Sequence, residues 1–61
     1  MIQVHFYYKN ALVAVKSINL PFEENHKEIA MQWAMDRKLG VENFDRVILL
    51  EEVDRTMYKP V

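Results

Sequence analysis

Apolar and polar residues alternate with a period of two at the start of the chain. Over residues 2–8 every second residue is apolar, which is typical of a strand with one buried face. A turn follows at Asn10, because asparagine tolerates a positive φ angle. A second β-rich run covers residues 11–20, where Lys16 and Ser17 interrupt the alternation as at a bulge or an edge. The pattern therefore predicts an antiparallel hairpin.

Residues 25–39 predict a helix. An asparagine at the first position is a capping residue, and Gly40 stands where a left-handed C-cap is expected. Projected at about 100° per residue, the segment has apolar side chains on two sides. We assign to the core the side that carries Ile29, Ala30, Trp33 and Ala34. The other side carries Met31 and Met35, and the reverse assignment, with the methionines in the core, stays open.

A third strand is predicted over residues 44–53. Its centre is the apolar run from Val47 to Leu50, as in a strand buried on both faces. Residues 54–61 are largely polar and include Pro60, which limits any strand, so we expect a tail that is either frayed or docked. The order β-β-α-β predicts one α+β domain over residues 1–61, with a three-stranded antiparallel sheet in the order 2-1-3 and one helix on one face.

The uncovered face of this sheet is expected to be apolar. It receives Gln3, His5 and Tyr7, one pair from the third strand (Val47 with Leu49, or Ile48 with Leu50) and one pair from the second strand (Val13 with Val15, or Leu12 with Ala14). An apolar patch of a few hundred Å² favours association with another molecule. The methionine side of the helix adds to this surface, since flexible thioethers suit adaptable interfaces.

The composition excludes several classes of function. The 61 residues include no cysteine, which excludes disulfide bonds, cysteine-ligated zinc and a thiol nucleophile. A single glycine excludes a glycine-rich phosphate loop, and a net charge of −1 lacks the basic excess of a protein that follows a phosphate backbone. No catalytic group of carboxylates or histidines is present. We therefore expect no enzyme activity, no catalytic residue, no metal and no cofactor.

Location follows from two further features of the sequence. No apolar run approaches the roughly 18 residues that a membrane span requires, so we expect no membrane partner. The N-terminal residues lack the basic and apolar regions of a secretory signal. Both features favour a cytoplasmic protein.

We expect the protein to bind another protein through its surplus apolar surface and a rim of acidic side chains. Glu51 and Glu52 point to opposite faces of their strand, so they form a charged rim and not a catalytic pair. The predicted contact residues are Tyr7, Met31, Met35, Ile48, Leu50, Glu51, Glu52 and Asp54.

Two other hypotheses compete with this one. The first is a homodimer with a structural or scaffold role, whose sheets pack face to face or join along edge strands. The second is a module for single-stranded nucleic acid, in which Tyr7 and His5 stack on bases while Lys9 and Lys16 lie at the rim. We do not expect nucleic acid to be the partner, because the net charge is negative and the basic residues are scattered.

The layout resembles the small host-takeover proteins of tailed phages. The likeness lies in a short hairpin, an alanine-rich helix with the sequence Gln32-Trp33-Ala34, a final strand and a short tail. It is similar to the phage inhibitor of host RNA polymerase, to the phage antitoxin that blocks an RNA-degrading toxin, and to anti-CRISPR proteins. The resemblance supplies no functional residue. It implies a phage or mobile-element protein that inhibits a host protein in the host cytoplasm by covering its surface.

Overall fold

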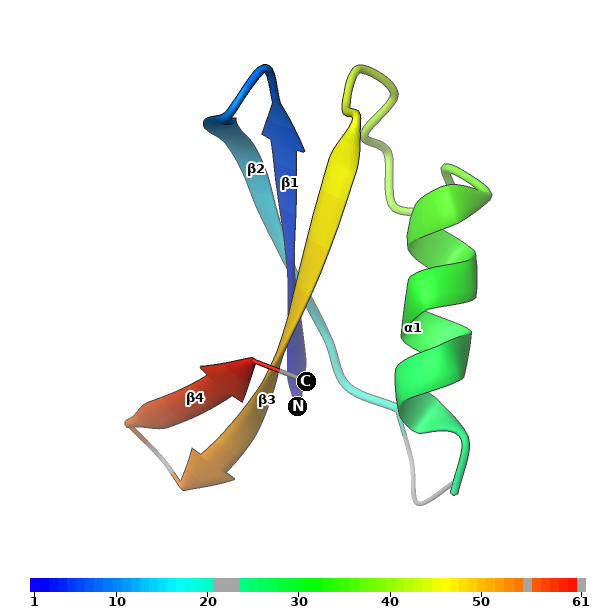
Figure 1. Cartoon of the computed structure of the whole chain (residues 1–61). Helices are drawn as coiled ribbons and strands as arrows, with labels where there is room; N and C mark the ends of the chain where they lie inside the picture. The colour runs from blue at the N-terminus through cyan, green and yellow to red at the C-terminus, as the bar shows by residue number, and fades with distance from the viewer. Residues whose placement is uncertain (21–23, 55, 61) are drawn as a thin grey trace.

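The chain folds into one sheet with a helix packed on one side of it (Figure 1). The computed structural model describes residues 1–20, 24–54 and 56–60. Within these residues four strands form an antiparallel sheet in the order β2-β1-β3-β4, which confirms the α+β class. The elements are β1 (Ile2–Tyr8), β2 (Ala11–Ile18), α1 (His26–Met35), β3 (Arg46–Asp54) and β4 (Met57–Pro60).

The sheet has one strand more than predicted, so the prediction of a three-stranded sheet in the order 2-1-3 is wrong. Much of segment 54–61, expected as a tail, forms β4 and pairs with the end of β3, where Lys59 lies opposite Glu51. Pro60 is compatible with β4 because it is the last residue of an edge strand, a position that tolerates a missing N–H. Residues 55 and 61 of this segment lie outside the described part of the chain.

The predicted hairpin between β1 and β2 is confirmed. Its two turn residues, Lys9 and Asn10, have φ angles of 50° and 65°. A positive φ at both central positions is what a type I′ turn requires, and this turn matches the twist of the two strands that it joins. The side chain of Asp45 fixes the turn from the start of β3, since its Oδ2 accepts the N–H of Lys9 at 3.0 Å.

A β-bulge in β2 lies near the turn. Phe6 lies opposite Ala14, whereas the next residue, Tyr7, lies opposite Leu12, so Val13 is the extra residue. Lys16 and Ser17, where a bulge or an edge was expected, pair regularly with β1, and the edge is the alternative that holds because β2 is an outer strand of the sheet. The shift is important for the surface, because it brings Leu12 to the same face as Tyr7.

Helix α1 is shorter than predicted, since it covers His26–Met35 and not residues 25–39. The carbonyl of Asn25 accepts the N–H of Ile29 at 2.9 Å, as an N-cap carbonyl does. Its side chain forms no capping bond to the residues that the structure describes.

The end of α1 is closed by a residue other than glycine. Arg37 adopts the left-handed conformation (φ 58°), and its N–H bonds the carbonyl of Ala34 at 3.1 Å. The N–H of Lys38 bonds the carbonyl of Trp33 at 2.9 Å, which completes a Schellman motif. Gly40 also has a positive φ (80°), but it lies beyond this motif, so the prediction that it caps the helix is wrong.

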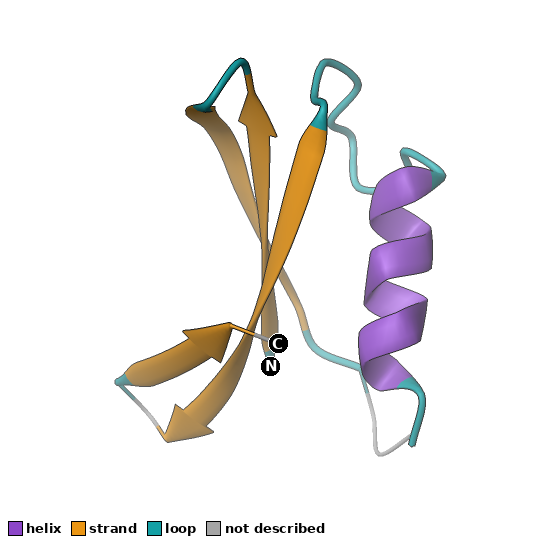
Figure 2. Ribbon diagram, viewed as in Figure 1, coloured by secondary structure: helices purple, strands orange, loops and turns teal. Residues whose placement is uncertain are grey.

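The hydrophobic core lies between α1 and the sheet. Its buried residues are Ile2, Val4, Phe6, Ile18, Ala30, Ala34 and Leu49. The connection from α1 to β3 adds Phe44, whose ring packs edge-on against Phe6 with 4.9 Å between ring centroids. All of this packing uses one face of the sheet, and Figure 2 shows β4 turned to the side away from α1.

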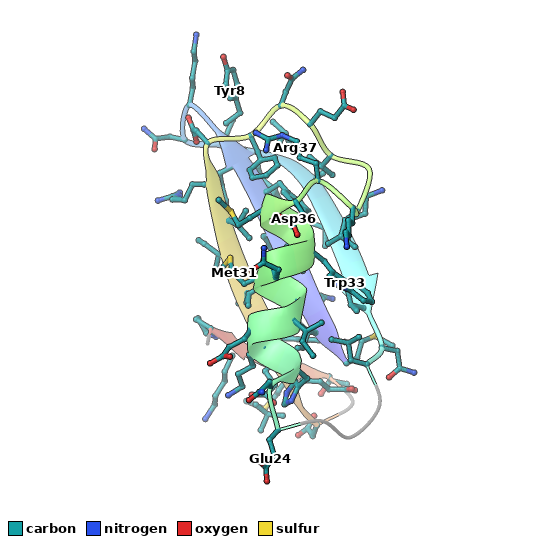
Figure 3. The ribbon with its side chains drawn as sticks, turned by 90° about the vertical axis from the view of Figure 1, so that its right-hand side faces the viewer. Tyr8, Glu24, Met31, Trp33, Asp36 and Arg37 are labelled. Atoms are coloured by element: carbon teal, nitrogen blue, oxygen red, sulfur yellow. The ribbon has the colours of Figure 1, made fainter. Side chains whose placement is uncertain are left out.

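The helix presents a narrow strip of small residues to the sheet, with larger side chains on its flanks. Ala30 and Ala34 are fully buried, so the side assigned to the core is right at these two positions, and its other two residues are half buried. Met31 lies on the flank toward β3 and Trp33 on the flank toward β2 (Figure 3). Both pack against the core, whereas Met35 is 53% exposed.

Candidate functional site

The open face is the side of the sheet that lies away from α1. Residues directly opposite each other on paired strands share a face, so the register sorts the side chains into rows. Three rows cross the middle of the open face from β2 through β1 to β3: Leu12–Tyr7–Arg46, Val15–His5–Ile48 and Ser17–Gln3–Leu50. A further row joins Glu52 of β3 to Tyr58 of β4.

An apolar strip runs across these rows. Its members are Tyr7, Leu12, Val15, Ile48 and Leu50. Leu12 is 52% exposed and Val15 is 44% exposed, while the other three side chains are half buried by their neighbours. Helix α1 lies on the opposite side of the sheet (Figure 2). The sheet therefore presents large apolar side chains on its second face, where exposure to water is unfavourable.

The polar side chains of the open face are ordered by contacts with one another. The guanidinium of Arg46 lies over the ring of Tyr7, 4.6 Å from the ring centroid, a cation–π contact. In the next rows, Nε2 of His5 lies 3.1 Å from Oε1 of Gln3. These contacts order the side chains of the central residues of β1.

A carboxylate lies at the opposite end of the open face from Arg46. Oε2 of Glu52 lies 3.5 Å from the amino group of Met1, and the N–H of Glu52 bonds the carbonyl of Met1 at 3.1 Å. The hydroxyl of Tyr58 lies 3.8 Å from the sulfur of Met1. The open face thus carries the Arg46 cation at one end and, at the other, the Glu52 carboxylate paired with the amino group of Met1, with the apolar strip between them.

The neighbouring acidic residue, Glu51, serves the other side of the sheet. Its Oε1 lies 3.0 Å from Nε2 of His26 and its Oε2 lies 2.9 Å from Nζ of Lys27, so it ties β3 to the first turn of α1. The hydrogen bond from Lys27, and after it the bond from His26, hold the pKa of Glu51 below its ordinary value of 4.5. The carboxylate of Glu51 therefore holds α1 against β3.

Asp54, the third predicted acidic contact, closes the turn between β3 and β4. Its Oδ1 accepts the backbone N–H of Thr56 at 2.9 Å and the hydroxyl of Thr56 at 3.3 Å. An aspartate that bonds the backbone two residues later is a common turn device. The contacts of Asp54 thus belong to the hairpin.

The eight predicted contact residues are divided between the two sides of the sheet. Tyr7, Ile48, Leu50 and Glu52 share the open face. Met31 and Met35 belong to the helix layer, where only Met35 is well exposed. Glu51 and Asp54 bond α1 and the β3–β4 turn.

Sequence reasoning missed several residues of the open face. Leu12 and Val15 lie together there only because of the bulge, and the regular pairs considered from the pattern separated them. Arg46 and Tyr58 could be placed only with the register of β3 against its two neighbours. A signal for Arg46 exists in hindsight, since it stands an even number of positions before Ile48 and Leu50.

The described residues enclose no pocket and contain no group of three side chains that could hold a metal ion. Within the same residues, no helix has the length and apolar character to cross a membrane.

Comparison of the chain with protein-family models, with curated protein sequences and with solved structures gives no match. Function is therefore argued from the open face, whose apolar strip, aromatic side chain and flanking charges have the composition of a binding surface.

Proposed function

We propose that this protein is a non-enzymatic binding module that covers the surface of another protein with its open face. The exposed apolar strip is the observation that carries the proposal. In the form suggested by the resemblance to small phage proteins, the module inhibits or modulates a host protein in the cytoplasm. It acts one-to-one, because occlusion of a surface requires a bound copy for each target.

The energetics of burial support this proposal. Fully burying one aliphatic side chain contributes about 1.5–3 kcal/mol, and Leu12 and Val15 are available for such burial. Protein interfaces concentrate this energy in a central apolar and aromatic cluster that is surrounded by polar residues. Here Tyr7 lies under Arg46, next to the row of His5, which is an arrangement of that kind.

The proposal is tested by comparing two variants that gain the same charge at equally exposed positions. Leu12→Glu places a carboxylate on the open face, and Met35→Glu places one on α1, where the native side chains are 52% and 53% exposed. Each tagged protein is incubated with a lysate of the host cell, and the amount of each retained protein is quantified.

We expect Leu12→Glu to retain at least about tenfold less of a specific target than the wild type, because a charge would be buried in the interface. Met35→Glu should retain the wild-type amount. Equal retention by Leu12→Glu and the wild type would refute the proposed role of the open face. Circular dichroism of both variants verifies that the fold is kept.

A further inference from the structure

The charges of the open face are arranged so that the face is complementary to itself. Arg46 and Glu52 stand near opposite ends of β3, about 20 Å apart at roughly 3.4 Å per residue. Ile48 and Leu50 lie between them on the same face. The midpoint falls at Leu49, whose side chain is buried in the core on the α1 side. A two-fold axis that crosses β3 at this level therefore exchanges the cation with the anion.

We infer that the open face is covered by a second copy of this chain, related by a two-fold axis that lies between the two sheets and runs across the strands. The inference rests on the proposed function, in that it names an occupant for the same surface. In this arrangement β3 of one copy runs antiparallel to β3 of the other. Arg46 of each copy then faces Glu52 of the other, while Ile48 faces Leu50. Two sheets stacked in this way keep nearly aligned strands, as in a β-sandwich.

The contacts at the ends of the face fit the same arrangement. Glu52 is held by the Met1 amino group at 3.5 Å, and Arg46 lies over Tyr7, so both charges are already positioned on the surface. The axis that pairs Arg46 with Glu52 also brings Tyr7 of one copy over Met1 of the other. Met1 is exposed, and a thioether sulfur at an aromatic ring is a favourable contact.

The extent of the open face requires an occupant that covers nearly all of it. The Cα atoms of the protein extend over 31 × 23 × 15 Å, and Figure 1 shows β4 turned out of the sheet on the side away from α1. A stable interface removes about 800 Å² of accessible surface from each partner, so little of the open face can stay uncovered. The two-fold arrangement covers it with matched charges and with both apolar strips buried.

A pair of charge-reversal variants tests this arrangement. Arg46→Glu alone places two carboxylates against each other across the dimer, and Glu52→Arg alone places two guanidinium groups together. Mixing the two variants restores an opposite charge at both contacts, because each copy then supplies what the other lacks. Lys16→Glu is the matched control, since Lys16 lies opposite Val4 on the α1 side of the sheet and is exposed. Association is measured by sedimentation equilibrium at low salt.

We expect the wild type and Lys16→Glu to sediment with the mass of two chains. Each reversal variant alone should associate at least tenfold more weakly, and their equimolar mixture should regain the dimer. Recovery in the mixture also shows that both variants are folded. A wild type that sediments as one chain at all concentrations overturns the inference. So does a mixture that stays monomeric, because it excludes the two-fold arrangement.

The outcomes for this inference and for the proposed function are separate. A monomeric wild type that captures a target, with the capture lost in Leu12→Glu, overturns self-association and keeps the open face as a binding surface for another protein. Salt-sensitive binding of single-stranded RNA or DNA by a monomer also overturns the second copy as occupant. A dimer that dissociates when the target binds is consistent with both, since the two partners compete for one face.

Discussion

The two methionines of α1 differ in environment although they lie one helical turn apart. Met31 is half buried against the core on the flank toward β3, and Met35 is exposed. We expect Met31→Glu to lower the free energy of unfolding by about 2 kcal/mol, because it places a carboxylate next to apolar side chains. Met35→Glu should change it by no more than about 0.5 kcal/mol. Urea unfolding followed by circular dichroism measures both. Equal effects would show that the flank position of Met31 is misassigned.

The ion pairs of Glu51 predict a pH dependence of stability. Its pKa is lowered in the folded state, so the folded protein holds the charged form more tightly than the unfolded chain does. The resulting stabilisation is present above the ordinary value of 4.5 and is lost as the pH falls through the lower folded value. Because about a third of the Glu51 side chain is open to solvent, the effect is small and decreases with added salt.

Glu51→Gln tests this pH dependence. We expect the wild type to lose more of its free energy of unfolding than the variant does between neutral pH and pH values below 4.5. Glu42→Gln, in the exposed connection between α1 and β3, serves as the control and should follow the wild-type curve. If the free energy of unfolding of the wild type and of Glu51→Gln depends on pH in the same way, the bonds from Lys27 and His26 are not the source of the stabilisation.

At the scale of the elements, the strands differ in how firmly they are held. Strand β1 lies between β2 and β3 and contributes Ile2, Val4 and Phe6 to the core, whereas the four-residue β4 lies at the sheet edge with no buried residue among those described. Amide hydrogen exchange reports such differences in local opening.

We therefore expect the hydrogen-bonded amides of β1 to exchange at least tenfold more slowly than those of β4, as measured by NMR. Exchange in β4 that is as slow as in β1 would mean that the β3–β4 hairpin opens only with the whole domain. Exchange in β2 supplies an internal comparison, because β2 also lies at an edge but contributes Ile18 to the core.

Most elements could be predicted from the sequence because their patterns are local. Alternation defines β1, and the positive φ angles of the turn agree with a hairpin. Strand β4 could not be predicted, because Met57 and Tyr58 are too short an apolar run beside polar residues and Pro60, and only pairing with β3 makes the segment a strand. The end of α1 was misplaced because Arg37, and not glycine, adopts the left-handed conformation.

The candidate site was predictable to a similar degree. Ile48 and Leu50 share a face because they are two positions apart in β3, but only the register of β3 against β1 places this pair, and not Val47 with Leu49, on the face of Tyr7. Leu12 and Val15 join them through a bulge that no local signal marks. Arg46 and Glu52 share a face by the same strand period, but only the register of β3 against β1 shows that this face is the open one.

At the scale of the whole molecule, the two faces of one thin sheet differ in how they are covered. Helix α1 and the connections around it bury one face, and the small size of the domain leaves nothing among the described residues to bury the other. A single layer of helix stabilises the fold, while the second face keeps large apolar side chains at the surface. In the function that we propose, the two sides of the sheet therefore separate stability from binding.

Which face meets another polypeptide is tested most directly by NMR of the uniformly labelled protein on dilution from concentrated to dilute solution. Within β1 and β3, we predict that dilution shifts the amide signals of two rows most. These are the row of His5 and Ile48 and the row of Gln3 and Leu50. The amide signals of Ala30 and Ala34 in α1 should change little. Changes that concentrate on α1, at Met31 and Met35, or no change with concentration and none on adding a captured target, would contradict the account.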